Sequence, residues 1–131
     1  MLQELTEWKS LYNPGTASNW HGRSDGASPE RFHEVVETTD LTQEITFKPD
    51  EKICAFLGFA SDEGIRRNQG RPGAIEGPKA IREALSNLPI PYPKRPSFYD
   101  VGDIVCENGD LERAQKGLGQ VVSYLLSKKA L

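Results

Sequence analysis

Three features are scarce in this sequence, and each absence excludes a class of protein. There is no apolar run long enough to cross a bilayer and no secretory leader, which argues against a membrane-bound or exported protein. A net charge of −3 argues against a nucleic-acid-binding surface, which would be basic. The only two cysteines, Cys54 and Cys106, suit small reduced thiols rather than a disulfide framework. We therefore expect a cytoplasmic protein with no membrane or nucleic-acid partner.

The most informative stretch is residues 53–88. It opens with an apolar run from Ile53 to Phe59, which is typical of a strand buried on both faces of a parallel sheet. A charged, glycine-rich segment follows and predicts a long loop, a kind of segment that is usually functional when it is ordered. Pro78 suits the start of a helix, because its missing N–H is not needed there. The helix would carry one apolar stripe, made of Ile81, Ala84, Leu85 and Leu88.

The residues on the N-terminal side of this stretch predict short elements. Apolar residues recur every three or four positions from Leu2 to Tyr12 and indicate a short amphipathic helix. A second helix start is indicated at residues 28–30, Ser-Pro-Glu, and a short edge strand at Ile45 and Phe47. We assign residues 1–51 to an N-terminal arm and residues 52–131 to an α/β domain.

On the C-terminal side, the residues from Phe98 to Val101 predict a second strand that Gly102 closes. Asp110 is a good N-cap for a last helix with a long apolar stripe. Two glycines inside this helix, at 117 and 119, each cost about 1 kcal/mol relative to alanine, and close packing would explain them.

Strand, helix, strand, helix with right-handed crossovers gives a parallel α/β sheet. The loops that follow the two strands, near Asp62 to Arg71 and near Asp103, then leave from one edge of the sheet. Ligands bind at this carboxyl-end edge in open α/β sheets. The glycine-rich loop is not a phosphate cradle, because it lacks both the P-loop lysine pattern and the Rossmann glycine spacing.

Three motifs, in the same order along the chain, resemble a known family. They are WHGRSDG (Trp20 to Gly26), GFASDEGIRRNQGRPGA (Gly58 to Ala74) and YDVGDIVCENGDLE (Tyr99 to Glu112). Together they resemble the ureohydrolases, the family of arginase and agmatinase, and they are most similar to its formimidoylglutamase branch. The resemblance runs from about Trp20 to the end of the chain.

The resemblance implies an arginase-like three-layer α/β/α sandwich and hydrolysis of a linear amidine. The substrate would be N-formimidoyl-L-glutamate, split into L-glutamate and formamide in histidine degradation, with two manganese ions as cofactor. The family builds its metal site from Gly-Gly-His, Asp-x-His-x-Asp and Asp-x-Asp segments, none of which occurs here. The resemblance therefore implies the N-terminal strands and helices of such an enzyme, inactive alone, with a homo-oligomer left open.

The candidate substrate-binding residues are Asn68 and Arg71, because the loop that carries them would pass the substrate. Asp62 and Glu63 could form an acid–base pair, but adjacent side chains point apart, so loop hydrogen bonds are the favoured interpretation. No catalytic residue and no metal ligand is predicted in this span. His21 and His33 are interpreted as surface residues, and so are Arg66 and Arg67. Docking of the arm onto the domain or onto a neighbouring subunit is expected of Trp20, Arg23 and Asp25.

Two alternatives remain open. One is another ureohydrolase that acts on a guanidine, as agmatinase and arginase do. The other is a non-catalytic small α/β domain that binds an anion or a partner.

Overall fold

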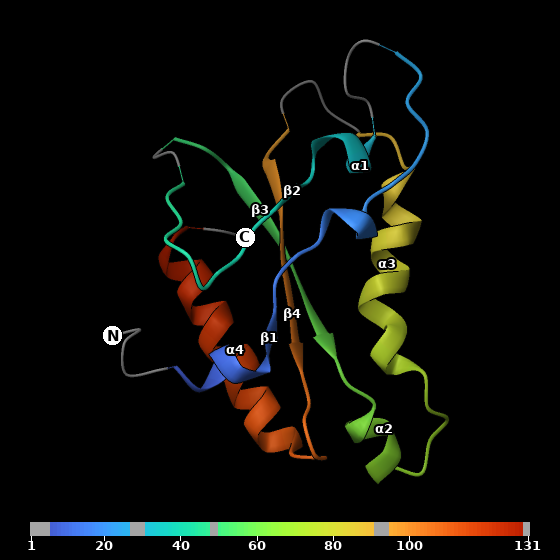
Figure 1. The fold of residues 1–131 in the computed structure, drawn as a ribbon, viewed down its shortest axis with the longest axis vertical. Helices are drawn as coiled ribbons and strands as arrows, with labels where there is room; N and C mark the ends of the chain where they lie inside the picture. The colour runs from blue at the N-terminus through green and yellow to red at the C-terminus, as the bar shows by residue number, and fades with distance from the viewer. Residues whose placement is uncertain (1–5, 27–30, 48–49, 91–94, 130–131) are drawn as a thin grey trace.

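The structure is a computed structural model that describes residues 6–26, 31–47, 50–90 and 95–129. Figure 1 shows three layers, in which the strands lie between helix α3 on one side and helix α4 on the other. Along the chain the elements are the 3-10 helix η2 (Glu7–Leu11), β1 (Tyr12–Asn13), the 3-10 helix η3 (Ala17–Asn19), α1 (Phe32–Val35), β2 (Glu37–Thr38), β3 (Ile53–Ala60), α2 (Glu63–Arg67), the 3-10 helix η4 (Ala74–Glu76), α3 (Gly77–Ser86), β4 (Ser97–Val105) and α4 (Leu111–Ser127).

Strand β4 is the centre of the sheet. Along one edge it pairs in parallel with β3. Along the other edge it pairs with β2 in parallel near its start and with β1 antiparallel near its end. A parallel pair requires a crossover, and α3 supplies it. The predicted α/β order with parallel pairing is therefore confirmed, although the antiparallel β1 makes the sheet mixed.

Several local predictions are confirmed at single residues. The apolar run forms β3, and α3 begins with a proline in its first turn. The carboxylate of Asp110 accepts a hydrogen bond from the backbone N–H of Arg113 at 3.1 Å and caps α4. No helix within the described ranges has the length and apolar character needed to span a bilayer.

The predicted end of the second strand at Gly102 is wrong, because β4 continues to Val105. Phe56 pairs with Asp100 and Leu57 with Gly102, so Val101 is an extra residue in a β-bulge. Gly102 has φ +93°, and a Cβ there would lie 2.0 Å from the carbonyl oxygen of Asn13. The glycine thus marks a bulge in the pairing with β3, at a point that β1 approaches closely, rather than a strand end.

Other predictions on the arm and the loop need correction. Ile45 and Phe47 lie in irregular backbone, and their alternation reflects side chains packed against the core rather than an edge strand. The segment predicted as a loop contains α2 and η4. The helix predicted near the N-terminus is a 3-10 helix, η2. The remaining positions of these predictions, 1–5 and 28–30, lie outside the described residues.

The core lies between the sheet and α4, where η2 also packs. Its buried members include Trp8, Leu11, Val101, Ile104 and Val121. A Cβ on Gly117 would lie in ordinary contact with Trp8 at 3.5 Å, and one on Gly119 would meet nothing within 4 Å. Close packing therefore does not require either helical glycine.

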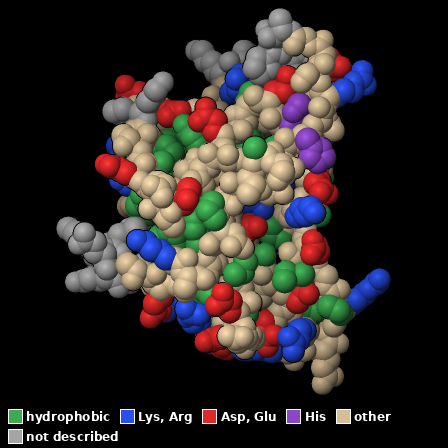
Figure 2. All heavy atoms as spheres, viewed as in Figure 1, with side chains coloured by type: hydrophobic (Ala, Val, Ile, Leu, Met, Phe, Trp, Pro, Cys, Tyr) green, Lys and Arg blue, Asp and Glu red, His purple; other side chains and the backbone are tan. Residues whose placement is uncertain are grey.

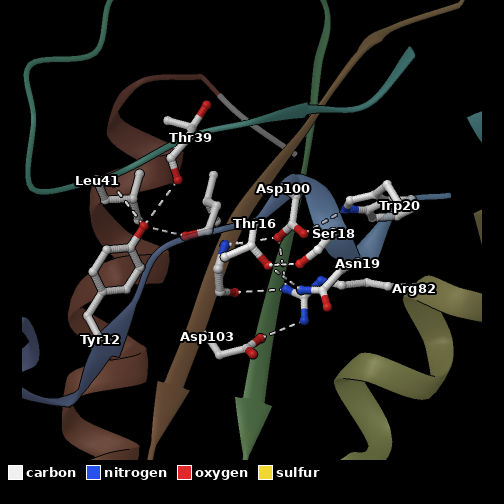
Figure 3. Close-up of polar contacts among 12 residues, drawn as sticks. Tyr12, Thr16, Ser18, Asn19, Trp20, Thr39, Leu41, Arg82, Asp100 and Asp103 are labelled. Atoms are coloured by element: carbon white, nitrogen blue, oxygen red, sulfur yellow. Dashed lines mark hydrogen bonds and ion pairs between the residues drawn. The ribbon is translucent and has the colours of Figure 1, made fainter. Parts of the chain in front are cut away.

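The hydroxyl of Tyr12 is a buried junction between the arm and the sheet (Figure 3). It donates to the carbonyl oxygen of Val101 and accepts from the backbone N–H of Leu41 at 3.0 Å. Burial raises the pKa of Tyr12 to about 12, so the phenol stays protonated as a donor.

The buried face of α3 differs from the predicted apolar stripe. Ile81 and Leu88 are 61% and 49% exposed, while Arg82 and Ser86 are buried. Arg82 points from α3 into the sheet (Figure 3) and donates to Asp100 at 2.9 Å and to Asp103 at 2.8 Å. Burial alone would lower the pKa of Arg82, but the hydrogen bond to Asp103 and the charge of Asp100 outweigh it and raise that pKa.

The N-terminal arm joins the same cluster through Trp20. Its indole N–H donates to the second carboxylate oxygen of Asp100 at 2.7 Å, and its ring lies 5.5 Å from that of Phe56. Gly58 makes room for the cluster, because a Cβ there would lie 1.9 Å from a carboxylate oxygen of Asp103. One buried ion cluster therefore joins helix, sheet and arm.

Removing the guanidinium tests this cluster. We expect Arg82→Met to lower the free energy of unfolding by about 3–5 kcal/mol, because it leaves the Asp100 carboxylate buried without its countercharge. Lys79→Met on the exposed side of the same helix is the matched control, with a change of about 0.5 kcal/mol or less. Urea unfolding followed by circular dichroism measures both, and equal effects of the two substitutions would contradict the role given to Arg82.

Candidate functional site

The carboxyl ends of β3 and β4 meet at the lower end of the molecule in Figure 1. Between the loops that leave them lies a polar pocket of about 420 Å³. This is the edge at which the sequence predicts a ligand. We call it the edge pocket, and its lining residues are Ser61, Asp62, Glu63, Arg66, Ile75, Cys106, Asn108 and Gly109.

Asp62 organises the loop that follows β3. Its carboxylate accepts hydrogen bonds from the backbone N–H groups of Ile75 at 2.6 Å and Gly73 at 3.2 Å. The hydroxyl of Ser61 accepts from the backbone N–H of Glu63 at 3.1 Å and begins α2. The structure thus confirms loop hydrogen bonds for Asp62, which holds the far end of the loop against its start.

Glu63 and Arg67 connect the two loops of the edge pocket. The guanidinium of Arg67 donates to the carboxylate of Glu63 at 3.2 Å and to the carbonyl oxygen of Gly109 at 3.0 Å. It also donates to both carboxylate oxygens of Glu112. The sequence-based interpretation of Arg67 as a solvated surface residue holds for its exposure, since 42% of the side chain is exposed, but not for its contacts. Arg66 fits that interpretation better, because its head is largely exposed and lies 3.4 Å from Glu63.

The paired hydrogen bonds between Arg67 and Glu112 also affect the pKa of Glu112, which lies in the first turn of α4. The hydrogen bond from the Arg67 guanidinium lowers the pKa of Glu112 from 4.5 to about 2. The same contacts raise the pKa of Arg67 above its ordinary value. Both groups therefore stay charged over the whole neutral range.

The two predicted substrate-binding residues lie just beyond α2. Asn68 is the C-cap of α2, and its backbone N–H donates to the carbonyl oxygen of Gly64 at 3.2 Å. Gln69 takes φ +57° and turns the chain toward Arg71. Both predicted residues are exposed, and neither lines the edge pocket. Within the described residues the Arg71 side chain makes no hydrogen bond or ion pair, so its binding role stays a prediction.

Sequence reasoning placed a second loop at this edge, near Asp103, but missed the residues of that loop that line the pocket. Cys106, Asn108 and Gly109 line it, and they follow β4 directly. The signal was present in the sequence, but the strand was predicted to close at Gly102, which shifted attention to Asp103. In the structure Asp103 lies inside β4 and faces Arg82 instead of the loop.

The arm docks onto the domain of the same chain, as one of the two sequence-based alternatives expected. Besides the buried Trp20, the backbone N–H of Arg23 donates to the side chain of Asn87 at 2.9 Å. Asp25 pairs with Arg31 at 2.6 Å, and Arg31 donates to the carbonyl oxygen of Asn87 at 2.6 Å. The arm therefore covers the C-terminal end of α3.

The histidines lie away from the edge pocket. Figure 2 shows histidine side chains at the upper right of this face, beside α1 and at the opposite end from α2. The ring of His33 bonds to the carbonyl oxygen of Arg23 at 2.8 Å. In the described part of the chain no three histidine, cysteine, aspartate or glutamate residues form a group that could hold a metal. These residues do not fit a pair of manganese ions.

Comparison with known proteins gives a consistent result. Residues 52–131 match the model of the Arginase family. A protein named formimidoylglutamase from Geobacillus thermodenitrificans (strain NG80-2) is 47% identical over 119 residues, which are 88% of this chain and 36% of the relative. Proteins of the same name from Lysinibacillus sphaericus (strain C3-41) and Legionella pneumophila (strain Paris) are 43% and 42% identical, over 91% and 88% of this chain and 37% and 35% of their own lengths. The chain thus spans about a third of these curated relatives.

The pairing of Arg67 with Glu112 predicts a pH dependence. Because the pKa of Glu112 is lowered from 4.5 to about 2 on folding, the pair stabilises the chain fully above pH 4.5 and loses this effect as the pH falls toward 2. We expect Glu112→Gln to lower the melting temperature at pH 7, with a deficit that shrinks through that window. Glu83→Gln, on the exposed face of α3, is the control. A deficit that grows on acidification would contradict this account.

Proposed function

This chain belongs to the arginase family, and on that premise we propose that it is the N-terminal part of a formimidoylglutamase. The observation that carries the proposal is the shared name of its curated relatives, which match the arm as well as the domain. Such an enzyme hydrolyses N-formimidoyl-L-glutamate to L-glutamate and formamide, a step of histidine degradation. Two free cysteines, Cys54 and Cys106, suit the cytoplasm as its location.

In the complete enzyme, two manganese ions would supply the chemistry of bond cleavage, namely activation of water and polarisation of the substrate. The described residues offer no ligand group for such a pair, so we assign no step of the hydrolysis to this chain. Its contribution is the framework of the carboxyl edge and the binding of the substrate's other end.

That other end carries two carboxylates, whereas the formimidoyl group is the part that reacts. An arginine guanidinium matches a carboxylate with two parallel hydrogen bonds, and an asparagine amide adds a neutral donor. We propose that Arg71 and Asn68 bind the glutamate end in this way. Support comes from the position of Arg71, which is exposed at the carboxyl edge on a loop whose backbone Asp62 holds in place.

A chimera tests the function. In it, this chain replaces the matching segment of the Geobacillus thermodenitrificans relative. We expect release of formamide from N-formimidoyl-L-glutamate with a kcat/KM within about tenfold of the intact relative. The 131-residue chain alone and the truncated relative alone should show no turnover. Preference for agmatine or arginine would point to another ureohydrolase. A chimera that melts cooperatively yet hydrolyses none of these substrates would favour a non-catalytic domain.

The role of Arg71 is tested in the same chimera. A charge-assisted hydrogen bond contributes about 1.5–3 kcal/mol, so Arg71→Ala should raise KM roughly ten- to a hundredfold. The value of kcat should change little, because the carboxylate is bound alike in the ground and transition states. Arg71→Lys should recover only part, since it lacks the planar fork.

Arg95→Ala provides the matched control, because Arg95 is exposed just before β4, at the amino end of the strand and away from the edge pocket. We expect its KM to equal that of the unmodified chimera. If Arg71→Ala leaves KM unchanged and lowers the melting temperature instead, the residue supports the loop and does not bind substrate.

A further inference from the structure

The loop between β4 and α4 contains Asn108 followed by Gly109, and no other asparagine in the sequence precedes a glycine. The two residues form a tight turn, in which the backbone N–H of Asp110 donates to the carbonyl oxygen of Glu107 at 3.0 Å. Both central residues have positive φ, +53° for Asn108 and +70° for Gly109, as in a type I′ turn. Such a turn favours asparagine followed by glycine, so the backbone accounts for the presence of the pair.

The same pair brings a side-chain amide next to an unhindered backbone nitrogen. Asn108 is exposed, and Gly109 has no side chain that could shield its N–H. Within the part of the chain that the structure describes, neither the side-chain amide of Asn108 nor the backbone N–H of Gly109 makes a hydrogen bond. No hydrogen bond of either group therefore has to break before the two groups react.

The other asparagines lack this combination. Asn13 precedes a proline, which has no N–H. Asn19, Asn68 and Asn87 precede residues with long side chains, which shield the next backbone nitrogen. The side-chain oxygen of Asn87 also accepts a hydrogen bond from the backbone of the N-terminal arm at 2.9 Å. Asn108 is therefore the asparagine of this chain that is most open to attack by its own backbone.

We propose that Asn108 is a site of spontaneous deamidation through a cyclic imide. The backbone nitrogen of Gly109 attacks the side-chain carbonyl carbon of Asn108 and forms a new C–N bond. The C–N bond of the carboxamide breaks, and its nitrogen takes up the proton of the Gly109 N–H and leaves as ammonia. Water then opens the imide. Cleavage of the new bond gives aspartate, and cleavage of the original main-chain bond between residues 108 and 109 gives isoaspartate.

Both products change the edge pocket, because Asn108 lines it. Each adds a negative charge to a lining that already contains the carboxylates of Asp62 and Glu63. Isoaspartate also lengthens the main chain by one carbon atom inside the turn. The carbonyl oxygen of Gly109 accepts from Arg67 at 3.0 Å and from the first backbone N–H of α4 at 3.0 Å, and the lengthened turn does not hold it at both donors. Isoaspartate formation therefore loosens the connection between the two loops of the pocket.

Ageing of the 131-residue chain at neutral pH tests the proposal. Isoaspartate is measured with a protein isoaspartate methyltransferase and located by peptide mapping, while circular dichroism follows the fold. We expect isoaspartate and aspartate at residue 108 and intact asparagine elsewhere. Asn108→Gln should lower the yield about tenfold or more, because the longer side chain closes its ring over a higher barrier. Asn19→Gln is the matched control and should leave the yield at residue 108 unchanged.

The same incubation in urea distinguishes the folded turn from the unfolded chain. Isoaspartate should form at residue 108 in native buffer as well as in urea. Formation in urea alone would overturn the proposal, because the turn would then protect Asn108. A native yield that Asn108→Gln does not lower would overturn it too. The covalent chimera is aged in parallel, in case the chain alone does not fold, and the absence of isoaspartate from the folded chimera would likewise overturn the proposal.

Thermal melting tests the effect on the loops. Aged protein enriched in isoaspartate should melt at a lower temperature than fresh protein. Asn108→Asp adds the charge without lengthening the main chain, so its melting temperature should lie closer to that of fresh protein. Equal melting temperatures of aged and fresh protein would contradict the loosening of the loops. None of these measurements uses a substrate, so their outcome is independent of the proposed function.

Discussion

The parallel pairing of β3 with β4 is the constraint on which the rest of the structure depends. It forces the chain to cross over through α3, and it brings the ends of two strands, and therefore two loops, to one edge. The buried cluster of Arg82, Asp100 and Asp103 fixes the crossover helix against the sheet. Trp20 donates a hydrogen bond to the carboxylate of Asp100, so the N-terminal arm depends on this cluster as well.

The edge pocket depends on this strand pairing, because the two loops that line it leave the carboxyl ends of β3 and β4. Asp62 holds the loop after β3 closed on itself, and Arg67 ties α2 to the start of α4. Both are charged side chains whose hydrogen bonds go to the chain's own backbone or countercharges. They therefore act as a frame, and Arg71 is an exposed charged residue on the loop that this frame holds.

Much of the fold could be predicted because its signals are local. The apolar run of β3, the proline of α3 and the Asp110 cap each act within a few residues. The bulge at Gly102 could not be predicted, because it depends on register with β3 and on the approach of Asn13. The role of Arg67 depends on Glu112, 45 residues away. For the site, the edge and the role of Asp62 were predictable, whereas the pocket lining after β4 was missed because the strand end was misplaced.

The central claim is that the chain is one part of a larger enzyme. Strand β3, which is apolar on both faces, is then an interior strand of the complete sheet, with the site at its carboxyl end. Hydrogen exchange of the β3 amides tests it most directly, in the 131-residue chain and in the chimera. In the chain alone, the amides that point away from β4 should exchange rapidly, while those bonded to β4 are protected. In the chimera, both sets should be protected along the whole strand. Equal exchange of the outward-facing amides in the two proteins would contradict the claim.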